Sequence, residues 1–104
     1  MIRKQDITTF KADANTIIWD VRDVSAYQEG HIQGAYNKPI ATLSAESLQT
    51  VDADQPIYIL CGGGSKAPRA AELLESLDAN REYVVLMGGT RAAKDAGWHL
   101  ITGE

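Results

Sequence analysis

The chain has 104 residues, of which 44% are hydrophobic and 23% are charged, and its formal net charge is −4. These values are typical of a globular protein, and we expect residues 1–104 to form a single domain with its own hydrophobic core. The acidic balance gives no electrostatic support for nucleic-acid binding, and no apolar run is long enough to cross a membrane.

The predicted elements alternate between short apolar strands and helices, bounded mostly by glycine or proline. In chain order we expect a strand at 16–19 that ends at Asp20, a helix at 24–28, an extended piece at 34–37, a short helix at 44–48, a strand at 57–60, a helix at 70–77, a strand at 83–86 and a last helix at 92–96. This alternation predicts an α/β fold with a mostly parallel central sheet and helices on both faces. The loops after Asp20, Cys61 and Met87 would then meet at the sheet edge where such folds bind ligands.

Cys61 is the only cysteine, and Gly62-Gly63-Gly64-Ser65-Lys66 separates it from a predicted helix. The N–H groups of such a loop and the positive end of a helix dipole both favour the thiolate, which is the nucleophilic form. A lone cysteine at a strand end is more often a buried core residue. A core residue, however, does not require three glycines, which let the backbone curl and a ligand approach closely. We therefore interpret Cys61 as a catalytic nucleophile in an anion-binding loop.

One cysteine cannot form an internal disulfide, and the first residues lead into no apolar signal segment. Both features favour a reducing compartment, and we expect a cytoplasmic protein. His31, His99 and Cys61 show no spacing typical of metal ligands, so we expect neither a metal nor another cofactor.

Three motifs resemble the rhodanese family. In chain order the matching residues are Asp20-Val21-Arg22, Tyr27, Glu29-Gly30-His31-Ile32, Gly34-Ala35, Asn37 and Pro39; then Cys61, Gly64 and Lys66; then Leu86-Met87-Gly88-Gly89. The motifs occur in the family's order and spacing, and the resemblance extends from about residue 6 to residue 98. It implies a rhodanese-like fold and a sulfurtransferase activity.

The resemblance further implies that Cys61 takes a sulfur atom from thiosulfate, or from a related donor such as 3-mercaptopyruvate, and becomes a persulfide that a thiol or cyanide then cleaves. The residues expected to bind the anionic donor, largely through backbone N–H groups, are Gly62, Gly63, Gly64, Ser65, Lys66 and Ala67. Asp20 and Arg22 are expected to form an ion pair that supports the loop. The sixth loop position, commonly arginine in the family, is Lys66, whereas Gly62 is more similar to members that use 3-mercaptopyruvate, so both donors stay open.

Three other functions share parts of the pattern. A cysteine-dependent phosphatase of the same fold needs Cys-x5-Arg, and that position is Ala67. A dinucleotide site would use Gly62-x-Gly64-x-x-Ala67, but no acidic residue follows the next strand to bind a ribose. A non-catalytic rhodanese-like module that binds a partner or senses something shares every motif but usually lacks the cysteine, and a sulfur-relay module that passes sulfur to another protein is the related alternative. These modules are the alternative that we keep.

Other polar residues near the motifs are predicted to have structural roles. His31 is expected to make hydrogen bonds rather than to act as a general base. Asn37 is interpreted as a turn residue. Arg69 and Arg91 could bring charge to the mouth of the site, but exposed surface positions are the expectation for both.

Overall fold

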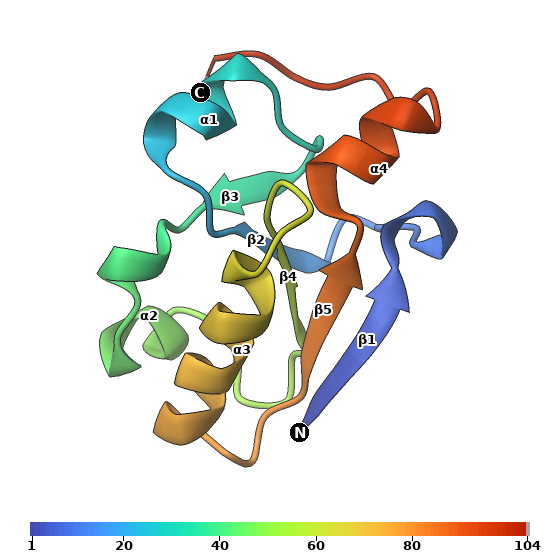
Figure 1. Cartoon of the computed structure of the whole chain (residues 1–104). Helices are drawn as coiled ribbons and strands as arrows, with labels where there is room; N and C mark the ends of the chain where they lie inside the picture. The colour runs from blue at the N-terminus through green and yellow to red at the C-terminus, as the bar shows by residue number, and fades with distance from the viewer. Residues whose placement is uncertain (104) are drawn as a thin grey trace.

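The computed structural model describes residues 1–103 and contains a five-stranded sheet whose strands are all parallel. The strands are β1 (Ile2–Asp6), β2 (Ile17–Asp20), β3 (Ala35–Asn37), β4 (Ile57–Leu60) and β5 (Tyr83–Met87). Their order across the sheet is β1-β5-β4-β2-β3, so β4 is central and has β5 and β2 as its neighbours (Figure 1). The C-terminal ends of these three strands therefore meet at one edge, as predicted.

Helices cover both faces of this sheet, which confirms the predicted α/β architecture. The α-helices are α1 (Val24–Glu29), α2 (Ala45–Gln49), α3 (Lys66–Leu77) and α4 (Gly89–Asp95), and the 3₁₀ helices are η1 (Ile7–Thr9) and η2 (Ile40–Thr42). Successive strand residues alternate between two apolar clusters. Ile59 packs with Leu48 of α2 and Leu74 of α3, whereas Leu60 packs with Tyr27 of α1 and Ala93 of α4. None of the helices of residues 1–103 is both long and apolar enough to cross a membrane.

The strand β1 was not predicted from the sequence. It pairs only with β5, from Ile2 opposite Tyr83 to Asp6 opposite Met87, and so forms one edge of the sheet. Its side chains are half-buried or exposed, and its sequence consequently lacks the apolar alternation that marks the inner strands. Charged residues on an edge strand also discourage pairing with another chain.

Two helices begin earlier than predicted. α3 begins at Lys66 instead of residue 70. Pro68 lies in its first turn, where N–H groups have no acceptor within the helix, so the missing N–H of proline costs no hydrogen bond. α4 begins at Gly89 instead of residue 92, and its first N–H groups donate to carbonyl oxygens of the loop after β4. That second start depends on a tertiary contact, which no local pattern reveals.

Tyr27 links α1 to the segment that follows it by a hydrogen bond and a ring stack. The buried phenol donates a hydrogen bond to the carbonyl oxygen of Ala35, and its ring stacks on His31 with centroids 3.7 Å apart. Nδ1 of His31 lies 2.8 Å from the carbonyl oxygen of Tyr27. His31 is thus a buried, hydrogen-bonded group, in agreement with the structural role expected for it.

The Tyr27 phenol makes the fold sensitive to alkaline pH. Burial, with a smaller contribution from the charge of Asp20, raises the pKa of Tyr27 above its ordinary value of 10.0. A raised pKa means that the stabilisation is present below the unfolded-state pKa and is lost as pH rises through the folded-state value. As the pH rises from about 9 to about 11, we therefore expect the free energy of unfolding to fall less for Tyr27→Phe than for the parent, measured by urea unfolding.

Tyr36→Phe is the matched control, because the Tyr36 side chain is 63% exposed. Burial also raises the pKa of Tyr83, so Tyr27→Phe should retain part of the alkaline loss. An alkaline loss in Tyr27→Phe equal to that of Tyr36→Phe would contradict the assignment to Tyr27.

Candidate active site

Cys61 lies directly after the central strand β4, and its side chain is buried, with 4% of the residue exposed. The alternation along β4 places it on the α3 side of the sheet, in the same apolar cluster as Ala67 at the start of α3. The thiol is therefore held close to the first turn of α3, which is the position that the sequence predicted.

The loop after Cys61 contains a run of backbone N–H groups that are free to bind a ligand. Within residues 1–103, the six consecutive N–H groups from Gly62 to Ala67 have no hydrogen-bond acceptor in the protein. The Sγ of Cys61 instead donates to the carbonyl oxygen of Gly64 at 3.6 Å, so the loop folds back over the thiol. Six consecutive unpaired donors in one short loop are available to an anionic ligand and would stabilise its charge without supplying a proton.

The three loop positions 62, 63 and 64 are glycine for different physical reasons. Gly63 has φ +125°, and a Cβ there would lie 3.0 Å from the carbonyl oxygen of Gly88, so the backbone requires glycine. Gly62 and Gly64 do not have positive φ, and a Cβ would meet nothing closer than 3.7 Å at Gly62 and nothing within 4 Å at Gly64. At these two positions the missing side chain leaves space beside the loop rather than relieving strain.

The start of α4 fixes the opposite side of the loop. Thr90 donates its N–H to the carbonyl oxygen of Cys61 at 2.9 Å, and Arg91 donates its N–H to that of Gly62 at 3.3 Å. A Cβ on Gly89 would lie 2.2 Å from the Cys61 carbonyl oxygen, so only glycine permits this contact. The Gly88-Gly89 pair is thus needed to bring β5 and α4 against the loop.

Asp20 and Arg22 form the predicted ion pair. The fully buried Asp20 carboxylate accepts from the Arg22 Nε at 3.0 Å and from a terminal guanidinium nitrogen at 2.8 Å. That same nitrogen donates to the carbonyl oxygen of Gly30 at 2.8 Å. The Cδ atom of Arg22 lies 3.7 Å from the position of a Cβ on Gly62, so the pair also abuts the loop.

Asn37 has a role that the sequence did not indicate. Its Nδ2 donates to the carbonyl oxygens of Asp20 at 3.1 Å and Arg22 at 3.0 Å, and thereby ties the end of β3 to the segment after β2. The interpretation of Asn37 as a turn residue was therefore wrong. A side chain that bridges backbone groups 15 and 17 residues away leaves no local signal.

The cations near the loop are mostly exposed. The Nζ of Lys66 lies 3.5 Å from an Asp23 carboxylate oxygen, and 37% of the Lys66 side chain is exposed. Arg69 and Arg91 are exposed, and neither forms an ion pair with any other residue of the 1–103 segment. The expectation of surface positions for the two arginines agrees with this geometry.

Comparison with known proteins decides the family. Residues 4–96 match the family model of the rhodanese-like domain. The chain belongs to the rhodanese-like family.

Solved structures agree with this assignment. A rhodanese-like domain of an Anabaena protein is 31% identical, with a TM-score of 0.74 over 86% of this chain and 94% of that one. A Bacillus halodurans protein superposes with a TM-score of 0.85 at 23% identity, over 96% of this chain and 77% of that one. A thiosulfate sulfurtransferase from Pseudomonas aeruginosa has a TM-score of 0.84 at 21% identity, and its match covers 98% of this chain but 20% of that one. The last two matches show the fold alone.

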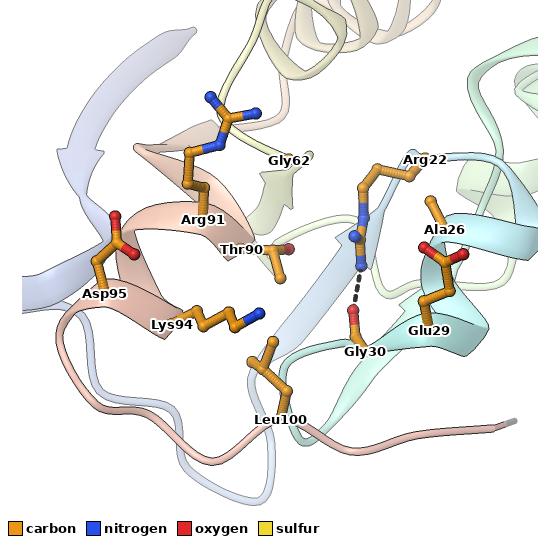
Figure 2. A pocket seen from close by; sticks show the side chains of 10 residues that line it. All are labelled: Arg22, Ala26, Glu29, Gly30, Gly62, Thr90, Arg91, Lys94, Asp95 and Leu100. Carbon is orange, nitrogen blue, oxygen red and sulfur yellow. Dashed lines mark hydrogen bonds between the residues drawn. The ribbon is translucent and has the colours of Figure 1, made fainter.

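This rhodanese-like domain has an open cleft of about 420 Å³ beside the loop, between α1 and α4. The lining residues are Arg22, Ala26, Glu29, Gly30, Gly62, Thr90, Arg91, Lys94, Asp95 and Leu100 (Figure 2). Gly62 is the loop residue that reaches this cleft. A second, small cavity of about 20 Å³ borders Cys61 itself, together with Gly63, Gly64 and Gly89. Sequence reasoning did not anticipate the cleft, because its two walls come from segments 60 residues apart.

Proposed function

We propose that this rhodanese-like domain is a sulfurtransferase in which Cys61 carries the sulfur. The Cys61 thiolate attacks the outer sulfur of thiosulfate, the sulfur–sulfur bond of the donor breaks, and sulfite leaves with the bonding electrons. Cys61 is then a persulfide. A thiol or cyanide acceptor attacks the outer sulfur of that persulfide and restores the Cys61 thiolate.

The observation that carries this proposal is the set of six unpaired N–H groups from Gly62 to Ala67 beside the only cysteine. Donor and persulfide are both anionic, and neither is stable in an apolar pocket without hydrogen-bond donors. The 20 Å³ cavity at Cys61 supports the proposal as well, because a space of that size holds about one water-sized atom. The outer sulfur of a persulfide needs room of that order.

The donor is thiosulfate in this proposal, and 3-mercaptopyruvate is the related alternative. Intact mass spectrometry after incubation with each compound in turn tests both. We expect the mass of one added sulfur atom with thiosulfate, and we expect a reductant to remove it. Absence of the added sulfur with both compounds would contradict the proposal.

The same experiment addresses the alternative of a sulfur-relay or binding module. A persulfide that forms but is not turned over by cyanide or small thiols would favour a protein as the sulfur acceptor. We further propose that the protein acts in the cytoplasm, where a reducing environment keeps Cys61 available as a thiol.

Lys66 is proposed to attract the anionic donor. Because its ammonium is partly exposed and shared with Asp23, its effect should be small. We expect Lys66→Ala to lower kcat/KM for thiosulfate about threefold. Lys66→Arg should keep or raise it, because a guanidinium binds an oxyanion through two parallel donors.

Asp23→Asn is the matched control for Lys66, because it releases the ammonium and should change kcat/KM in the opposite direction. Added salt should reduce the difference between Lys66→Ala and the parent, since exposed charges are screened. If Lys66→Ala equals the parent at low salt, the charge has no part in donor capture.

A further inference from the structure

A groove between α2 and α3 leaves apolar side chains uncovered. It has a volume of about 320 Å³, and its lining residues are Ala45, Leu48, Gln49, Val51, Ala53, Leu77, Asp78 and Arg81. Leu77, at the end of α3, is 43% exposed, and Leu73, one helical turn before it, is 37% exposed. Side chains four residues apart lie on the same face of a helix, so the two leucines form an apolar stripe beside the groove. Adjacent exposed apolar side chains, unlike scattered ones, are typical of a surface that binds another protein.

The groove is remote from the cysteine. α3 begins at Lys66 in the loop after β4, and a helix rises about 1.5 Å per residue, so Leu77 lies roughly 16 Å further along the helix axis. Figure 1 shows α2 beside α3, with the loop after β4 at the other end of α3 from Leu77. A protein bound in the groove would therefore leave the loop at Cys61 uncovered.

The segments on the two sides of the groove carry charge of one sign. Residues 39–65, which include α2, and residues 70–80, which include most of α3, contain no lysine, arginine or histidine. Their acidic residues are Glu46, Asp52, Asp54, Glu72, Glu75 and Asp78. Arg81 lines the groove, but it is buried, and its guanidinium donates to backbone carbonyl oxygens of the segment between α2 and β4. The groove is therefore complementary to a positively charged partner.

Three exposed carboxylates border the groove, those of Glu46, Asp52 and Asp54, and we call them the rim carboxylates. Each follows a lining residue in the chain, and none forms an ion pair with any other residue of the described range 1–103. Asp78, in the lining itself, lies 3.6 Å from the Nε of Arg81, which is longer than a hydrogen bond. Cationic side chains of a partner could therefore reach the rim carboxylates without breaking an ion pair within the described chain.

We propose that this groove binds an amphipathic helix of another protein, with apolar side chains on one face and lysine or arginine on the flanks of that face. The apolar face covers Leu73 and Leu77, and the flanking cations lie against the rim carboxylates. The lining comes from two helices and the segment after α2 and offers no strand edge, so an extended peptide would leave its backbone groups unpaired, whereas a helix satisfies its own. An anionic membrane surface does not fit, because the rim carboxylates repel it.

Titration with a synthetic amphipathic helix of leucine and lysine tests the proposal. Amide signals of the isotope-labelled protein report where the helix binds, and we expect those of Ala45 and Leu77 to shift and those of residues 62–67 to stay. Leu77→Ser should raise the Kd about tenfold, because it removes a leucine side chain from the contact. Glu46→Gln should raise the Kd about threefold, since an exposed ion pair contributes little.

Each variant has a matched control outside the groove. Val24→Ser changes an exposed apolar side chain of α1 and Glu29→Gln an exposed carboxylate of the same helix, and neither should alter the Kd. The same synthetic helix with glutamate in place of lysine should not bind. Equal binding of the two helices, absence of the shifts at Ala45 and Leu77, or a Kd that Leu77→Ser leaves unchanged would overturn the proposal. Sedimentation in which the parent self-associates and Leu77→Ser does not would also overturn it, because a second copy of this chain would then occupy the groove.

Discussion

Cys61→Ser should abolish sulfur transfer from every donor and leave the fold intact. Serine is a far weaker nucleophile at neutral pH, and its oxygen cannot form a persulfide. We expect turnover to fall by at least about 10³-fold, to the uncatalysed background. The measurement is the rate of thiocyanate formation from thiosulfate and cyanide.

The fold should tolerate this change because the substitution is nearly isosteric. The Cys61 thiol makes one long contact, 3.6 Å from Sγ to the Gly64 carbonyl oxygen, so the substitution removes little hydrogen bonding. Circular dichroism and the thermal midpoint should therefore match the parent. Transfer that persists in a correctly folded Cys61→Ser protein would exclude Cys61 as the sulfur carrier.

Asp20→Ala should produce the largest loss of stability. The substitution removes the buried partner of Arg22 and leaves a guanidinium, 14% exposed, with the Gly30 carbonyl oxygen as its remaining acceptor in the described chain. Breaking a buried pair in this way costs on the order of 3 kcal/mol. For a domain of about 100 residues that corresponds to a fall of roughly 10 to 20 °C in Tm, measured by thermal unfolding.

Asp23→Ala is the control for Asp20, because its side chain is 76% exposed and its removal should cost less than about 0.5 kcal/mol. The double variant Asp20→Ala/Arg22→Ala should lose less stability than the sum of the two single variants, since the residues act as a pair. An unchanged Tm in Asp20→Ala combined with lost turnover would instead make Asp20 a member of the catalytic machinery.

The inner part of the fold could be predicted because its strands are buried and carry a strong local signal. The run 57–60 and the run 83–86 are apolar on both sides, as strands between two helical layers must be. Edge strand β1 escaped prediction because one neighbour and exposed side chains impose no such pattern.

The candidate site also has a part that the sequence predicted and a part that it did not. The thiol, the glycines after it and the Asp20–Arg22 pair lie within short segments, so their residue types indicated their places. The bridge made by Asn37, the early start of α4 at Gly89 and the cleft between α1 and α4 each join distant segments. Such contacts depend on how elements pack, and a single sequence does not encode them in any local pattern.

The hydrogen bonds from α4 to the loop have a consequence for how this scaffold can diversify. Gly89, Thr90 and Arg91 immobilise the carbonyl side of the loop, while Gly64 on its outer side has nothing within 4 Å of a Cβ. A side chain at position 64 could therefore be added without displacing the sheet or α4. Side-chain variation in this loop is thus open at position 64 and closed at position 63, where the positive φ and the nearby Gly88 carbonyl oxygen require glycine.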